Sequence, residues 1–166
     1  MEWTYEKITQ WFERYFEDVC RYQGSLETVP NLRRYFSEDL KLRMYTSPSS
    51  PPAVTMSRDD LLFSFIHPGL QEDIKPKQMV VDVEKRIVAV RFEIRFKDMP
   101  SKTEWPPLEA SAHYELVSDE NGGLKISRIH YWTEKLPGDL FEFWGRRREE
   151  ELRRSALAIL ASGSSE

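Results

Sequence analysis

The N-terminal part of the chain repeats apolar side chains at three- and four-residue steps. Between Tyr5 and Tyr22 the apolar positions include Trp11, Tyr15 and Phe16, and charged residues fill the positions between them. This spacing predicts an amphipathic helix whose apolar face is strongly aromatic. Gly24 follows directly and predicts the end of the helix.

Two shorter helices are predicted next. Proline in the first turn favours a short helix between Thr28 and about Phe36. The stretch Ser57-Arg58-Asp59-Asp60 has the spacing of a capped helix start. The apolar residues after it extend this helix to His67, where Pro68 and Gly69 end it.

The pattern changes to period two in a short run after the second helix and again from about Lys77 onwards. Alternating runs of this kind predict strands with one buried face. Turn residues separate the later runs, so they predict an antiparallel meander. The proline-rich segment Ser47–Pro52 predicts a surface loop, with a mobile flap as the alternative. The predicted strands are 40–46, 78–85, 86–97, 108–117 and 122–135.

A last helix is predicted from Asp139 to about Ala161, after the break at Leu136-Pro137-Gly138. Its charged middle, Arg146–Glu151, is typical of a solvated helical segment. The chain therefore divides into an α+β domain over residues 1–136 and a helical extension with a frayed tail over 137–166. Three N-terminal helices would cover the apolar face of a curved antiparallel sheet.

Composition narrows the function. The chain has 166 residues and a formal charge of −4 with both signs interspersed, which argues against nucleic acid and anionic membranes as partners. Cys20 is the single cysteine and the three histidines are far apart, so neither a disulfide nor a metal or cofactor site is predicted. The sequence shows neither a membrane span nor a signal peptide, which favours the cytoplasm.

Two small residues on the apolar face of the sheet bear on a pocket. Ala110 and Ala112 lie opposite the larger Phe92 and Ile94. A sheet that curls around a long helix could leave space above the alanines, or the core could fill it. The sequence leaves both alternatives open.

Several segments together resemble the nuclear-transport-factor-2-like superfamily, which includes ketosteroid isomerase, scytalone dehydratase and the SnoaL-like cyclases. The resemblance covers roughly Glu13 to Lys135. It implies a cone-shaped fold, a deep and largely apolar pocket, and a homodimer formed through the outer face of the sheet. It does not imply one reaction, because this fold hosts many. The segments are 13–17, 35–39, 58–60, 90–94 and 123–134.

The catalytic residues of this superfamily carry over only in part. Tyr15 falls at the position of the isomerase's oxyanion-binding tyrosine, but the base position falls on Met44 and the second acid on Ala112. Neither residue can transfer a proton, which argues against ketosteroid isomerisation by the familiar mechanism. Arg91 and Glu93 resemble part of an epoxide-hydrolase set, but alternation favours placing them outward.

The histidines are the remaining acid–base candidates. His67 follows a helix, which favours a structural role, and His113 shares a face with glutamates and is expected outside. The orientation of His130 depends on register. If Ile126 and Ile129 both face inward, a bulge lies between them and His130 faces outward, whereas an inward Trp132 brings His130 inward with it.

The resulting hypothesis is an enzyme that acts on an apolar polyketide- or terpenoid-like molecule by acid–base chemistry, as an isomerase, cyclase or dehydratase. Tyr15 would hold a substrate oxygen while His130 moves a proton, with His67 in reserve. The predicted pocket lining is Trp11, Leu42, Met44, Phe63, Val90, Phe92, Ala112, Tyr114 and Trp132.

The alternative is a non-catalytic domain of the same fold that binds an apolar ligand or forms a dimer. The missing acids at Met44 and Ala112 favour it. Titratable groups that converge inside the cone would favour the enzyme, whereas an interior without polar side chains would favour the binding protein.

Overall fold

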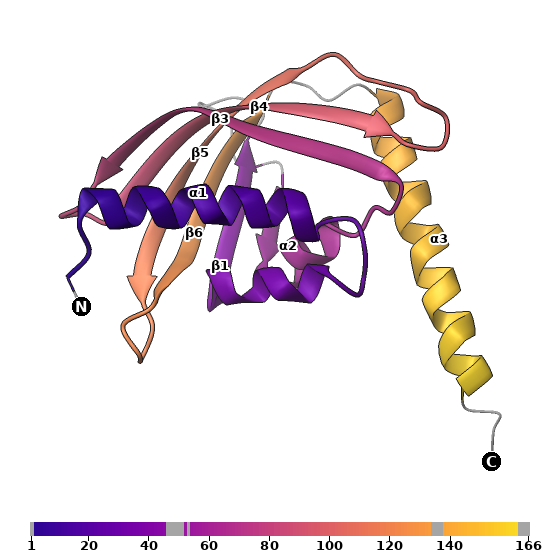
Figure 1. The fold of residues 1–166 in the computed structure, drawn as a ribbon, viewed down its shortest axis with the longest axis horizontal. Coiled ribbons are helices and arrows are strands. Elements are labelled where there is room, and N and C mark those ends of the chain that lie inside the picture. Colours follow the sequence, from indigo (N-terminus) through magenta and orange to yellow (C-terminus); the bar gives the residue numbers. More distant parts are fainter. Residues whose placement is uncertain (1, 46–51, 53, 134–137, 163–166) are drawn as a thin grey trace.

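The computed structural model describes residues 2–45, 52, 54–133 and 138–162. The helices and strands confirm a mixed α+β fold with a curved, mostly antiparallel sheet (Figure 1). Most of the predicted 47–52 loop and the predicted break at 136–137 lie outside the described residues. The elements are α1 (Tyr5–Tyr22), the 3₁₀ helix η1 (Val29–Tyr35), β1 (Phe36–Tyr45), β2 (Val54–Ser57), α2 (Arg58–Ser64), β3 (Leu70–Asp82), β4 (Ile87–Asp98), β5 (Leu108–Ser118), β6 (Leu124–Thr133) and α3 (Gly138–Ser162).

Helix ends follow local capping chemistry. Thr4 caps α1 by accepting a hydrogen bond from the Lys7 backbone N–H. Ser57 and Asp60 form the predicted capping box at the start of α2. The α2 helix ends at Ser64, however, so the prediction that it continues to His67 is wrong. Five residues of irregular chain, 65–69, therefore separate α2 from β3.

The sheet has the strand order β2-β1-β6-β5-β4-β3. Strands β3 to β6 form the predicted antiparallel meander, and β1 joins it by pairing in parallel with β6. Three features were not predicted: β2 itself, the start of β1 at Phe36 and the start of β3 at Leu70. In Figure 1 the sheet curves over α1, which lies along its concave face.

A bulge in β6 determines which way its last residues face. Glu115 pairs with Arg128 and Leu116 pairs with Ile126, so Ser127 is an extra residue on β6. Both Ile126 and Ile129 are buried. Alternation beyond the bulge places Tyr131 inward with Ile129, and His130 and Trp132 on the outer face.

The core lies between the aromatic face of α1 and the concave face of the sheet. Phe12 packs edge-on against Tyr114, with ring centroids 5.0 Å apart, and Phe16 lies 5.9 Å from Phe92. On β4 the residues Val88, Val90, Phe92, Ile94 and Phe96 are all buried, as their alternation predicts. Arg91 is exposed, and Glu93 binds Arg95 and Lys77 rather than projecting inward.

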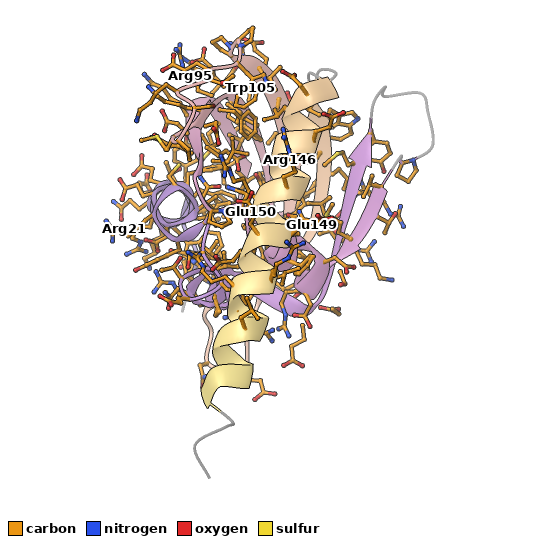
Figure 2. All side chains as sticks on the ribbon, turned by 90° about the vertical axis from the view of Figure 1, so that its right-hand side faces the viewer. Arg21, Arg95, Trp105, Arg146, Glu149 and Glu150 are labelled. Atoms are coloured by element: carbon orange, nitrogen blue, oxygen red, sulfur yellow. The ribbon has the colours of Figure 1, made fainter. Side chains whose placement is uncertain are left out.

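Helix α3 lies across one end of the cone, on the side where α1 ends (Figures 1 and 2). Leu140 is fully buried, and the Trp105 indole N–H donates to Asp139 at 3.2 Å. Arg147 donates through Nε and Nη2 to Oδ1 of the buried Asp98, at 3.1 and 2.8 Å. These contacts attach α3 to the sheet, and the domain boundary at residue 136 stays a prediction.

The Asp98–Arg147 pair predicts an acid-sensitive attachment. Burial raises the pKa of Asp98, but hydrogen bonds from Ser101 and Arg147 outweigh burial and hold that pKa below the ordinary value of 3.8. A depressed carboxyl pKa contributes stability that is present above pH 3.8 and is lost as the pH falls further.

We expect Arg147→Met to weaken the docking of α3 by about 2 kcal/mol, because it leaves a buried carboxylate without its cation. The NMR signal of the Trp105 indole N–H, which donates to α3, should move toward its exposed position in this variant. In the wild-type protein the same movement should occur only in acid. An unchanged signal in Arg147→Met would show that the pair does not hold the helix.

Candidate active site

A cavity of about 340 Å³ lies between α1, the concave face of the sheet, α2 and α3. Its size is at the lower end of the range for small-molecule sites. Most of the lining is apolar, with a few polar groups among the aliphatic and aromatic side chains. The lining residues are Tyr15, Phe16, Val19, Leu42, Met44, Met56, Leu61, Ser64, Phe65, Glu72, Ile74, Phe92, Ile94, Tyr114, Ile129, Tyr131, Gly145 and Arg148.

The structure brings together four of the nine predicted lining residues, Leu42, Met44, Phe92 and Tyr114, and the predicted catalytic Tyr15 lines the cavity with them. The other five predicted residues do not.

Each of those five lies elsewhere for a physical reason. Val90 and Ala112 are buried in the packed core outside the cavity, so the space does not lie above the alanines. Trp11 lines a separate, more polar surface depression along another side of α1. Phe63 is 41% exposed on the outside of α2, and Trp132 is on the outer face of the sheet because of the β6 bulge.

Three tyrosines present their rings to the cavity. Burial raises the pKa of Tyr15, Tyr114 and Tyr131, so their phenols stay protonated at neutral pH. The charge of Glu72 raises the pKa of Tyr15 and Tyr131 further. Protonated phenols can donate hydrogen bonds to an oxygen of a bound molecule.

Glu72 is the acidic residue among the lining residues, and it lies beside His67. The Glu72 side chain is 7% exposed and that of His67 is fully buried. Nε2 of His67 lies 3.5 Å from Oε2 of Glu72, slightly beyond hydrogen-bond length. Nδ1 of His67 lies 3.0 Å from the Leu70 carbonyl oxygen, which can only accept. Nδ1 therefore carries a hydrogen, and Nε2 is the ring nitrogen that can exchange a proton with Glu72.

The backbone fixes this pair in place. The His67 N–H donates to the Gly24 carbonyl at 3.1 Å, and the Gly24 N–H donates to the Phe65 carbonyl at 2.7 Å. Gly24 has a φ of +102°, a conformation that residues with a Cβ rarely adopt. The end of α1 thus holds the connection between α2 and β3, and with it His67.

Glu72 was missed at the sequence level because the start of β3 was missed. Leu70, Glu72 and Ile74 alternate inward along this strand, while Gln71 and Asp73 face outward. A glutamate in the middle of the inward row interrupts the apolar pattern that identifies a strand. Leu70 and Ile74, four residues apart around it, were the available signal.

His130 does not line the cavity, so the expectation that it shares the cavity with Tyr15 is wrong. It lies on the outer face, where its Nδ1 is 3.1 Å from the Tyr45 hydroxyl and its ring stacks near Trp132. Partial burial lowers its pKa, although Glu115 opposes this. His113 is also exposed on this face, as predicted.

The described residues contain no group of three or more side chains that could hold a metal ion. None of the helices among them is long and apolar enough to cross a membrane.

Comparison with solved structures shows the fold. ActVI-ORFA from Streptomyces coelicolor superposes with a TM-score of 0.59 at 11% identity, over 80% of this chain and 98% of that one. Nuclear transport factor 2 from Cryptosporidium parvum superposes with a TM-score of 0.55 at 15% identity, over 76% of this chain and 90% of that one. SalBIII superposes with a TM-score of 0.53 at 15% identity, over 77% of this chain and 91% of that one. It is an epoxide hydrolase/cyclase-like enzyme with a role in pyran ring formation in salinomycin.

The chain therefore has the cone-shaped fold of nuclear transport factor 2, as the sequence predicted. No family model matches the sequence, and no curated protein matches it. Identities this low show the fold alone, and enzymes and a transport factor share it.

The buried tyrosines predict a specific alkaline instability. A phenol whose pKa is raised in the folded state contributes stability that is present below the ordinary tyrosine pKa of about 10 and is lost as the pH rises above it. Tyr15→Phe should flatten the fall in unfolding free energy above that pH by about 1.4 kcal/mol per pH unit. Urea denaturation on both sides of the tyrosine pKa measures this slope. Equal slopes in the two proteins would contradict a buried Tyr15 phenol.

Proposed function

We propose that this protein is an acid–base enzyme for a small, largely apolar molecule that carries an oxygen function, of the polyketide or terpenoid kind. The reaction is an isomerisation, cyclisation or dehydration that moves a proton. The observation that carries the proposal is Glu72 among the lining residues of a mostly apolar cavity, with the buried His67 beside it. A titratable group inside the cone supports the enzyme over the binding protein.

Each polar group has a role in the proposed reaction. The Glu72 carboxylate takes a proton from the carbon next to a substrate carbonyl. Tyr15 or Tyr131 donates a hydrogen bond to the oxygen, where negative charge develops. His67 is a positioning residue, since its Nε2 lies beside Oε2 of Glu72 and can accept a hydrogen bond from that carboxyl group once Glu72 has taken the proton. Glu72 then returns the proton to the same or another carbon, so the enzyme is unchanged.

The cavity walls serve the same chemistry. Residues such as Leu42, Phe92 and Ile129 exclude water and bind the body of the substrate. In such surroundings a hydrogen bond from a phenol to an oxyanion is stronger than it is in water. Met44 and Ala112 leave no second acid at the familiar positions, so Glu72 takes over proton transfer from a different strand.

The non-catalytic alternative remains a second candidate because one observation favours it. Apolar side chains dominate the lining, and such a cavity can bind an apolar molecule without reacting with it. The two candidate functions differ in whether Glu72 transfers a proton to and from the bound molecule.

Proton exchange separates them without knowledge of the natural substrate. We expect the protein to accelerate the exchange of the α-protons of 2-tetralone, a bicyclic ketone, for deuterium in D₂O, followed by NMR. Glu72→Gln should lower this acceleration by about 100-fold or more, the usual contribution of a positioned general base. Tyr15→Phe should lower it by about 10-fold or more, because one oxyanion donor is lost.

Matched variants complete this experiment. Glu13→Gln changes an exposed glutamate on α1 and should keep the wild-type rate. His130→Ala should also keep it, because His130 lies outside the cavity. If the α-protons of 2-tetralone exchange no faster with the wild-type protein than in buffer alone, the result favours the non-catalytic ligand-binding function. Exchange that is equally fast in Glu72→Gln would refute the role of Glu72.

A homodimer through the outer face of the sheet is part of the proposal. Tyr45, His113, His130 and Trp132 form an aromatic cluster on this face, with His113 and Trp132 ring centroids 4.9 Å apart. Aromatic side chains of this kind are enriched at protein interfaces. We expect Trp132→Glu to convert a dimer into a monomer in sedimentation velocity while the fold is retained. An unchanged sedimentation coefficient would place the interface elsewhere or exclude it.

A further inference from the structure

Arg148 of α3 lies at the edge of the cavity and is among its lining residues, together with Gly145 one turn before it. Its guanidinium lies over the Phe63 ring, 4.9 Å from the ring centroid. Nη2 is 3.5 Å from the Ser64 carbonyl oxygen, a long contact. The buried Nε has no hydrogen-bond partner among the described residues.

Arg148 also lacks an acidic partner within the described part of the chain. Among the described residues no carboxylate lies within 4.0 Å of its nitrogens, and this includes Glu72, which lines the same cavity. Burial lowers the pKa of Arg148, and no nearby charge opposes this effect. The preceding residue contrasts with it, because Arg147 binds both Asp98 and Glu150.

A half-buried guanidinium without a counter-ion is costly, since it has lost water and gained no anion in return. Phe63 and the Ser64 carbonyl hold the group in place but leave Nε unused. The planar fork of an arginine matches a carboxylate, which can accept two of its N–H groups at once. The other lining residues around it are mainly apolar.

We propose that Arg148 is a substrate-binding residue that pairs with a carboxylate on an otherwise apolar ligand. The ligand carboxylate pairs with Arg148, and the apolar body extends along the cavity toward Tyr15. This inference rests on the proposed function of the same cavity and names its substrate class as an apolar carboxylic acid. It also gives α3 a role in recognition, in addition to its packing against the sheet.

A matched pair of fluorescent ligands tests the charge. 2-Naphthylacetate and 2-naphthylacetamide share one apolar body and differ only in the carboxylate. The wild-type protein should bind the acid about 10-fold or more tightly than the amide, because a charge-assisted pair forms only with the acid. Arg148→Gln should bring the two affinities within about twofold by weakening the acid alone. Arg148→Lys, which keeps the charge without the fork, should restore part of the preference.

Two further variants locate the effect. Arg153→Gln removes an exposed positive charge from the same helix and should keep the preference for the acid. Gly145→Leu should weaken both ligands, because a Cβ at Gly145 meets no atom within 4 Å and a larger side chain there enters the cavity. Melting curves confirm that each variant is folded.

The outcomes are distinct from those of the proton-exchange experiment. The inference is overturned if the acid and the amide bind equally, if the acid does not bind at millimolar concentration, or if Arg148→Gln keeps the preference. Ketone exchange that depends on Glu72, with no preference for the acid, would leave the enzyme proposal intact. A preference for the acid without ketone exchange would leave a carboxylate-binding protein.

Discussion

The contact between the aromatic face of α1 and the curved sheet is the constraint on which the rest depends. Phe12 and Phe16 pack against Tyr114 and Phe92 with centroid distances of 5.0 and 5.9 Å, and these rings fill the middle of the cone. Beyond Phe16 the helix presents the smaller Val19, while the sheet continues to the start of β3. Because close packing ends there, the cavity lies toward α2 and α3 and not above Ala112.

The buried polar side chains in and beside this cavity do not serve the stability of the fold. Glu72 and His67 are almost fully buried, and Arg148 is half-buried with no acidic partner among the residues that the structure describes. Apolar residues of similar size would fill these positions at lower free energy. The cavity lining also carries two kinds of charge chemistry, the carboxylate of Glu72 with an imidazole behind it and the guanidinium of Arg148. Polar groups arranged in this way favour an oriented ligand over a general apolar one.

The sequence predicted those parts of the fold in which periodicity and burial agree. The α1 helix and the β4–β5–β6 meander have clean apolar stripes, and the capping box at Ser57 is a local signal that needs no tertiary information. The start of β3 was missed because Glu72 occupies an inward position that the pattern reserves for apolar residues. The charged segment around Arg148 predicts a solvated helix face, because helical spacing alone does not show that α3 borders a cavity. Polar residues at buried positions interrupt the hydrophobic periodicity, so periodicity alone does not identify them.

One extra residue on β6, Ser127, determines which side chains of this strand face the cavity. Without this extra residue, strict alternation from Ile126 would place His130 inward with Trp132, and Ile129 and Tyr131 would face outward. With it, Ile129 and Tyr131 line the cavity, and His130 joins Tyr45 on the outer face. The bulge thus exchanges a histidine for a phenol inside the cone. A phenol with a raised pKa donates hydrogen bonds but does not accept protons near neutral pH. In the proposed reaction, proton transfer therefore comes from another strand, β3, through Glu72.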